Sequence, residues 1–254
     1  MAASGQDRPN IALILGSGPD VTAAAAWPRA PFRTIIAIIN AWQVRSDWDY
    51  LIHPEDFDPE RLPVAYDDGK KTVVTACDYV PEQNKFGGFV YAGGTMAFTA
   101  GYWALGALKP DVLAFFGCDM NYSQGQTHFY GKGTADPLRD DITLQSLEAK
   151  SARLMFLAAS RGCLAVNLSE QAQSRLVFPN QTAGQIARWS KMTVAGQLAH
   201  LGQFGNQTKA DAALRREEEL GYMAVSGRYW EELDRFDPAE LRKLDALWLE
   251  AAKR

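Results

Sequence analysis

The sequence predicts an α/β protein with a doubly wound, mostly parallel sheet and a helical C-terminal extension. Short continuous apolar runs, each of the length of a strand buried on both faces, recur between residues 10 and 170. Segments with helical patterns separate these runs, as in a parallel sheet covered by helices on both faces. The strand signals fade beyond residue 179. We therefore expect residues 1–179 to form the α/β domain and residues 180–254 to form helices packed on it.

The composition is that of a globular protein and narrows the classes of partner. The chain has 254 residues, of which 47% are hydrophobic and 22% charged, and its net charge is −4. This charge argues against a general nucleic-acid or anionic-membrane surface. No apolar run approaches the roughly 20 residues of a membrane span, and the N-terminus lacks a basic-then-apolar signal, so we expect a cytoplasmic protein. Cys77, Cys118 and Cys163 lie in or beside strand-like runs, and we expect buried free thiols.

The first predicted strand, residues 11–15, ends at a glycine turn formed by Gly16, Ser17 and Gly18. A helix is expected over 21–26, with Asp20 as its cap. A strand, a glycine turn and a helix in this order are typical of a phosphate or nucleotide loop, although Val21 replaces the third glycine of a dinucleotide fingerprint. The alternative is a tight turn that binds no ligand.

The second predicted strand, residues 34–39, ends at Asn40. The Asn40 amide could contact a ribose or a base, or it could simply form a turn. Enzymes that use NAD often have an acidic residue near this place, so hydride transfer is the least favoured chemistry. Two shorter strands are predicted at 49–53 and 72–76.

The central stretch, residues 91–131, contains a second glycine turn. Gly93, Gly94 and Thr95 open a nearly apolar helix, and a buried strand follows at 111–116. Glycines allow close approach of the backbone to a ligand, and a helix N-terminus favours negative charge. This turn is therefore a second candidate phosphate site, with the same alternative of a turn that binds nothing.

Polar side chains follow the strand at 111–116, where ligands bind in open parallel sheets. Asp119 comes directly after the strand, and Tyr122 and His128 lie farther along the loop. A carboxylate in this place could orient a substrate or bind a metal, and a histidine suits acid–base catalysis. The alternatives are a turn-capping Asp119 and a structural His128.

The remaining elements complete the predicted fold. A long helix is expected over 140–161 and the last strand over 163–168. Helices are expected over 180–205 and 209–220, and a final helix begins with Asp237 as its cap and Pro238 in its first position.

Four sequence segments resemble one superfamily with a Rossmann-like fold. They are GSGPD, AIINAW, DYLIHPEDF and GGTMAFTAGYWALGA…FFGCDMNY, and the resemblance covers roughly residues 10–170. The superfamily includes bacterial CMP-sialic-acid sialyltransferases, the 6-hydroxymethylpterin diphosphokinase (MptE-like) proteins, and related flagellin-glycosylation accessory factors. The resemblance implies that residues 1–179 form a Rossmann-like nucleotide-binding domain.

The resemblance also implies roles for individual residues. Gly16, Ser17 and Gly18 would bind the nucleotide with Asn40 as a second contact, and Gly93, Gly94 and Thr95 would hold phosphate. Asp119 and Tyr122 would lie near the donor. The sialyltransferases use a histidine well downstream of the aspartate as general base, whereas His128 follows Asp119 closely here and the next histidine is His200. This departure argues against a sialyltransferase mechanism.

Three functions follow from these observations. The first is a glycosyltransferase-like enzyme that takes a nucleotide-sugar donor and a small-molecule or glycan acceptor, with His128 and Asp119 as its catalytic residues. The second is an ATP-dependent diphosphokinase for a pterin-like acceptor, in which Asp119 would bind Mg²⁺. The third is a nucleotide-binding or assembly protein without catalysis. No cofactor is certain, although Mg²⁺ is possible. No partner nucleic acid or membrane span is expected, and a homo-oligomer stays open.

Overall fold

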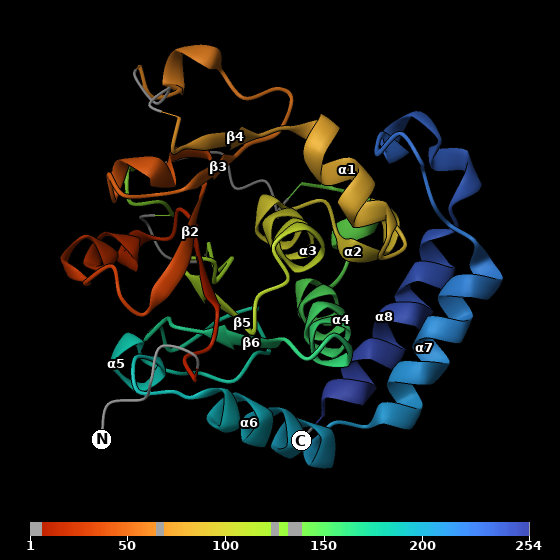
Figure 1. Ribbon diagram of the computed structural model, residues 1–254. Coiled ribbons are helices and arrows are strands. Elements are labelled where there is room, and N and C mark those ends of the chain that lie inside the picture. The colour runs from red at the N-terminus through yellow and green to blue at the C-terminus, as the bar shows by residue number, and fades with distance from the viewer. Residues whose placement is uncertain (1–6, 65–68, 123–126, 132–138, 254) are drawn as a thin grey trace.

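Six parallel strands form one sheet in the computed structural model, which describes residues 7–64, 69–122, 127–131 and 139–253 (Figure 1). The strand order is β4-β3-β2-β1-β5-β6, and every neighbouring pair is parallel. The predicted doubly wound, Rossmann-like fold is confirmed. The strands are β1 (Ile11–Leu15), β2 (Phe32–Ile38), β3 (Tyr50–Ile52), β4 (Thr72–Val74), β5 (Val112–Phe116) and β6 (Leu164–Asn167).

The chain reverses its direction of winding at β1. From β1 the sheet grows through β2, β3 and β4 on one side and through β5 and β6 on the other. Ligands of open α/β sheets bind in the crevice outside the carboxyl ends of the two strands at such a switch point. Here those strands are β1 and β5, which end at Leu15 and Phe116.

Helices cover both faces of the sheet. They are α1 (Ala76–Asn84), α2 (Phe89–Ala92), α3 (Met96–Ala107), α4 (Leu147–Ser160), α5 (Ala183–Ile186), α6 (Lys191–Phe204), α7 (Gln207–Leu220) and α8 (Pro238–Ala252). The 3₁₀ helices are η1 (Pro19–Ala26), η2 (Ile39–Gln43), η3 (Pro59–Arg61), η5 (Ile142–Leu144), η6 (Tyr229–Glu231) and η7 (Leu233–Arg235).

The side chains of β1 alternate between two apolar cores. Ala12 and Ile14 belong to the core that α1, α2, α3, α4, α7 and α8 share, whereas Ile11, Leu13 and Leu15 face the core with η1, α5 and α6. All five are at most 1% exposed. The period of two along a strand explains why one apolar run serves two cores.

The C-terminal extension packs on α4 through two buried ion pairs. Lys150 Nζ lies 2.8 Å from Asp245 Oδ1 of α8, and Arg153 Nη2 lies 2.7 Å from Glu217 Oε2 of α7. Trp248 Nε1 also donates to Glu217 Oε1. Loss of one member of a buried pair typically costs about 3–5 kcal/mol, so these contacts fix α7 and α8 against the α/β domain (Figure 1).

The structure corrects several predicted boundaries. The segment expected to be an Asp20-capped helix over 21–26 is η1, which starts after Gly18 and has no side-chain cap. The long helix expected over 140–161 is divided into η5 and α4, because Ser146 Oγ accepts from Ala149 N and starts a new helix. The region 180–205 is likewise divided into α5 and α6. The predicted start of the final helix is confirmed, with Asp237 accepting from Ala239 N.

The cysteine prediction is correct for two of three residues. Cys118 and Cys163 are buried free thiols, whereas Cys77 is exposed because it lies in the first turn of α1. No helix in the described part of the chain is long and apolar enough to cross a membrane.

Candidate functional site

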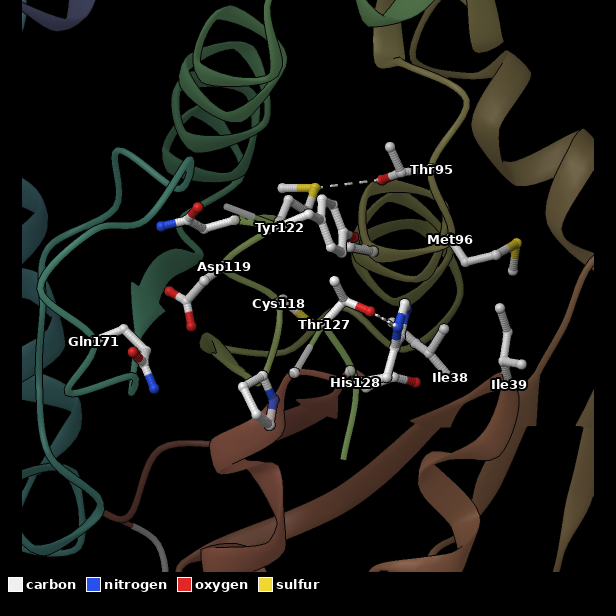
Figure 2. A pocket seen from close by; sticks show the side chains of 18 of the residues that line it. Ile38, Ile39, Thr95, Met96, Cys118, Asp119, Tyr122, Thr127, His128 and Gln171 are labelled. Carbon is white, nitrogen blue, oxygen red and sulfur yellow. Dashed lines mark hydrogen bonds between the residues drawn. The ribbon is translucent and has the colours of Figure 1, made fainter. Parts of the chain in front are cut away.

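A cavity of about 390 Å³ lies at the switch point, beyond the carboxyl ends of β1 and β5 (Figure 2). Pockets that bind small molecules typically enclose about 300–1,000 Å³. In Figure 2, Asp119 and Gln171 lie on one side of this cavity, and His128, Met96 and Ile39 lie on the other. The residues that line it come from six segments: 16–19, 38–39, 95–97, 117–122, then 127, 128 and 130, and finally Gln171 with Gln173.

The N-terminus of α3 forms one wall of the cavity. Thr95 is the N-cap, and its Oγ1 accepts from Phe98 N at 3.3 Å. The next two residues, Met96 and Ala97, line the cavity. Their backbone N–H groups have no acceptor within the described residues, as expected for the first turn of a helix. With the helix dipole, these two donors favour a negatively charged ligand.

Asp119 is held at the opposite side of the cavity. Its side chain is only 7% exposed, and its Oδ1 accepts from Asn167 Nδ2 at 3.2 Å. Its Oδ2 is buried without a hydrogen-bond partner in the described part of the protein. A buried carboxylate oxygen without a donor is costly, so this atom is suited to accept a hydrogen bond from a ligand.

A second carboxylate, Asp20, lies close to Asp119. Ser169 Oγ donates to Asp20 Oδ2 at 3.2 Å, and Asp20 Oδ1 is buried without a partner among the described residues. Burial raises the pKa of Asp20, and the nearby Asp119 carboxylate raises it further. Ser169 N in turn donates to Asn167 Oδ1, which connects the ends of β1, β5 and β6 through polar side chains.

His128 approaches the cavity from the loop after β5. Its Nδ1 forms a 2.8 Å hydrogen bond with Thr127 Oγ1. Its ring stacks on Tyr130 at 5.0 Å and lies 5.8 Å from Tyr122, measured between ring centroids. Phe129 N donates to Ser17 O at 3.0 Å, which attaches this loop to the turn after β1. His128 and Asp119 therefore share one cavity, as a pair of catalytic residues requires.

The first glycine turn lines the cavity but offers few donors to it. Gly16 N and Gly18 N donate to Phe116 O and Gly117 O, both at 2.8 Å, and Pro19 has no N–H group. A Cβ atom on Gly16 would lie 2.2 Å from Gly117 O, and one on Gly18 would lie 2.9 Å from the same oxygen. Close packing of β1 against β5 thus accounts for both glycines, and a ligand contact at this turn stays a prediction.

Three residues of the predicted site lie outside the cavity. Asn40 is 1% exposed in η2, and neither atom of its amide has a partner in the described part of the chain. Gly94 N donates to Thr143 Oγ1 at 3.0 Å, and Gly93 packs against Lys150. Of the second glycine turn, only Thr95 reaches the cavity.

No family model matches this chain, and curated proteins and solved structures give no match either. The superfamily resemblance of the sequence therefore stays a prediction, and the site itself carries the functional argument.

Two residues at the cavity have strained backbone. Ile39 has φ 55° and Met120 has φ 51°, although neither is glycine. A positive φ is unusual for a bulky side chain and a true outlier for a β-branched one. Such strain concentrates at functional sites. Thr95 Oγ1 also donates to Met120 Sδ at 3.9 Å, which joins the strained turn after β5 to the start of α3.

The sequence did not single out the polar residues after β6, of which Asn167 donates to Asp119 and Ser169 donates to Asp20. Asn167 ends β6, and Ser169 and Gln171 follow it, at the same edge of the sheet as Asp119. Their place directly after a buried strand was the available signal. Cys118 also lines the cavity, but burial and then the carboxylates of Asp119 and Asp20 raise the pKa of its thiol, so it is a poor nucleophile.

Proposed function

We propose that this chain is a nucleotide-dependent transferase that takes a nucleotide-sugar donor. One observation carries the proposal: the N-terminus of α3, Asp119 and His128 all line one cavity at the switch point, and Asp119 Oδ2 has no hydrogen-bond partner among the described residues. These groups supply an anion site, a hydrogen-bond acceptor and an acid–base group within one site. Transfer of a sugar from a nucleotide can use all three.

The donor phosphate is proposed to bind at α3 and not at the first glycine turn. Met96 and Ala97 can each offer a backbone N–H, whereas Gly16 and Gly18 donate theirs to the end of β5 and only the Ser17 N–H of that turn has no acceptor among the described residues. The carboxylate of Asp20 beside the first turn also disfavours an anion there. The donor hydroxyls are then proposed to face Asp119.

His128 is proposed to take the proton of the acceptor hydroxyl. The hydroxyl oxygen forms a bond to the anomeric carbon of the donor sugar, while the bond from that carbon to the phosphate oxygen breaks. The electron pair leaves with the nucleotide phosphate, where the helix dipole of α3 stabilises it. Asp119 accepts a hydrogen bond from a ribose or sugar hydroxyl and so orients the donor.

One feature favours a second candidate, diphosphate transfer from ATP with Mg²⁺. Asp20 and Asp119 each have a buried oxygen without a partner in the described part of the chain. Mg²⁺ is commonly bound by one or two carboxylates together with water and substrate phosphates, so these two side chains could act as its protein ligands. The described residues contain no larger group of His, Cys, Asp and Glu placed around one point.

The test is a thermal-shift screen against CMP, CDP, UDP, GDP, NAD, and ATP with and without Mg²⁺, followed by nucleotide release from the matching nucleotide sugars. A ligand of the folded state raises the melting temperature. We expect a shift with a pyrimidine or guanine nucleotide, and release slowed about 100-fold or more by His128→Ala. The exposed Asp234→Ala is the control for Asp119→Ala.

Each other outcome removes a candidate. A shift with ATP only when Mg²⁺ is present replaces sugar transfer with diphosphate transfer. Turnover that survives both Asp119→Ala and His128→Ala contradicts the catalytic assignment. Binding without turnover, together with a stable complex with another protein, replaces the enzyme with a binding protein.

A further inference from the structure

A second cavity lies beside the first and shares a wall with it. It is an open groove of about 830 Å³ between the segment after β6 and one face of α6. We propose that this groove binds an uncharged, hydroxyl-rich acceptor, namely a neutral oligosaccharide chain. The role of this ligand as an acceptor rests on the proposed transferase function, whereas carbohydrate binding by the groove can be tested without that function.

The shared wall is the stretch from Gln171 to Ser174. Gln171 lines both cavities, Gln173 lines the first, and Ala172 and Ser174 line the second. This alternation has the period of two that an extended chain gives. A molecule in the groove is therefore separated from a donor in the first cavity by a wall only one chain thick, and Gln171 can touch both.

The wall and the floor of the groove are firmly held. Arg175 N donates to Asp119 O at 2.9 Å, and Val177 N donates to Ser151 Oγ of α4 at 2.9 Å. Phe178 is 3% exposed and packs on Phe115, with 5.1 Å between the ring centroids. The groove is thus formed before any ligand arrives, which lowers the entropic cost of binding.

One face of α6 forms the other side. Gln197, His200 and Leu201 line the groove and lie three and four residues apart, so they project from one face of the helix. Asn180 and Gln181 approach from the segment that pairs with the end of β6. Four of these side chains provide amide and imidazole groups, and Leu201 adds to the aliphatic surface beside them.

The chemistry of this lining selects the class of ligand. None of the residues that line the groove is Lys, Arg, Asp or Glu. The full set is Gln171, Ala172, Ser174, Leu176, Val177, Phe178, Pro179, Asn180, Gln181, Gln197, His200 and Leu201. A nucleic acid, an acidic glycan or a charged peptide would find no opposite charge here. Each side-chain amide both donates and accepts, which matches a sugar hydroxyl, and the aliphatic groups can cover the C–H faces of the rings.

The experiment measures binding of neutral oligosaccharides to the whole protein by saturation-transfer NMR and calorimetry. The probes are maltotriose, cellotriose and N-acetylated chitotriose, with a sialylated trisaccharide and a lysine-rich peptide for comparison. The test variant carries Gln197→Ala and His200→Ala, both on α6. Its control is Gln203→Ala, an exposed amide on the same helix that does not line the groove.

We expect at least one neutral trisaccharide to bind, with affinity reduced ten-fold or more in the double variant and unchanged in Gln203→Ala. We also expect that trisaccharide to speed nucleotide release from the donor in the wild type and not in the double variant. The inference is overturned if no neutral trisaccharide binds, if the double variant binds as the wild type does, or if only the charged probes bind.

The nucleotide screen separates this inference from the proposed function. If a nucleotide binds but no trisaccharide does, the proposed carbohydrate site is contradicted and the proposed transferase function is not. If a trisaccharide binds in a way that depends on Gln197 and His200, but no nucleotide stabilises the protein, the carbohydrate site is supported and the transferase function is contradicted.

Discussion

The turn after β1 and the turn before α3 both contain two glycines, but they differ in where their backbone N–H groups point. In the first turn, Gly16 and Gly18 donate to carbonyl oxygens at the end of β5. In the second, Gly94 donates to Thr143, and Met96 and Ala97, which line the cavity, have backbone N–H groups without an acceptor among the described residues. Two similar sequence patterns therefore serve different purposes.

This difference shows that a glycine-rich turn predicts close packing more directly than it predicts a phosphate site. A missing side chain lets any backbone approach, whether that of a ligand or that of a neighbouring strand. The number of N–H groups that remain without an acceptor decides which turn can hold an anion. Met96 N and Ala97 N at the start of α3, and only Ser17 N in the first turn, have no acceptor among the described residues, so the start of α3 is the better candidate for an anion site.

The largest loss of stability should come from adding a methyl group to the first glycine turn. In Gly16→Ala the new Cβ, whose position the backbone fixes, would lie 2.2 Å from the backbone oxygen Gly117 O. We expect a loss of about 3 kcal/mol in the free energy of unfolding, measured by urea denaturation. Gly196→Ala, where nothing lies within 4 Å, should instead gain up to about 1 kcal/mol. A Gly16→Ala protein as stable as the wild type would show that the turn is not closely packed.

A smaller loss of stability is expected when a side chain that holds the second glycine turn in place is changed. Tyr229 Oη donates to Asp141 Oδ2 at 2.5 Å and accepts from Arg139 Nη2, which also donates to Gly94 O. Tyr229→Phe should lower the free energy of unfolding by about 1.5 kcal/mol at pH 7. Tyr50→Phe is the control, since the Tyr50 hydroxyl has no partner in the described part of the chain.

The same variant has a predicted pH dependence. Burial raises the pKa of Asp141, but hydrogen bonds from Tyr229 and Thr143 outweigh it and hold that pKa below its usual value. A carboxyl with a lowered folded pKa stabilises the protein above its unfolded pKa of about 3.9, and this contribution is lost as the pH falls through the folded pKa. The deficit of Tyr229→Phe should therefore shrink in strong acid. A deficit that does not change with pH would contradict the role of this carboxylate.

The contribution of Asp20 to stability should depend on pH with the opposite sign. Burial and then the Asp119 carboxylate raise the pKa of Asp20, so the folded protein binds its proton more tightly than the unfolded chain does. Stability is then lost as the pH rises from about 3.9 through the raised pKa. We expect Asp20→Asn to be more stable than the wild type at pH 7 and to lose this advantage near pH 3.5. The control is Asp234→Asn, and a lower stability of Asp20→Asn at pH 7 would show that the charge is needed for folding.

The smallest effect is expected at Asn40. Its amide is buried away from the cavity and has no partner among the described residues. Because a buried amide without partners costs about 1–3 kcal/mol, Asn40→Leu should be at least as stable as the wild type. Its nucleotide affinity, measured by calorimetry, should stay within about two-fold of the wild-type value because Asn40 does not line the cavity. A ten-fold loss of nucleotide affinity would instead support the contact between Asn40 and the ribose that the sequence predicts.

The fold followed from the sequence because the strands are continuous apolar runs and the switch point follows from their order. The location of Asp119, Tyr122 and His128 followed too, since all three come after β5 at the carboxyl edge. The partner of Asp119 did not follow, because Asn167 lies 48 positions away in the chain. The direction of each backbone N–H is also absent from a sequence. Gly93 and Gly94 therefore resembled a ligand turn until their neighbours, Lys150 and Thr143, were seen.

The most direct test removes one backbone N–H from the start of α3. Proline is tolerated at the first position of a helix, and Thr95 before it has φ −108° and ψ 144°, which suit a residue that precedes proline. Met96→Pro therefore deletes a donor at the cavity and keeps the helix, and Met96→Ala is the control that keeps the donor. By calorimetry with the nucleotide that stabilises the protein most, we predict about ten-fold weaker binding to Met96→Pro than to Met96→Ala. Equal binding by the two variants would contradict the proposal that α3 holds the phosphate.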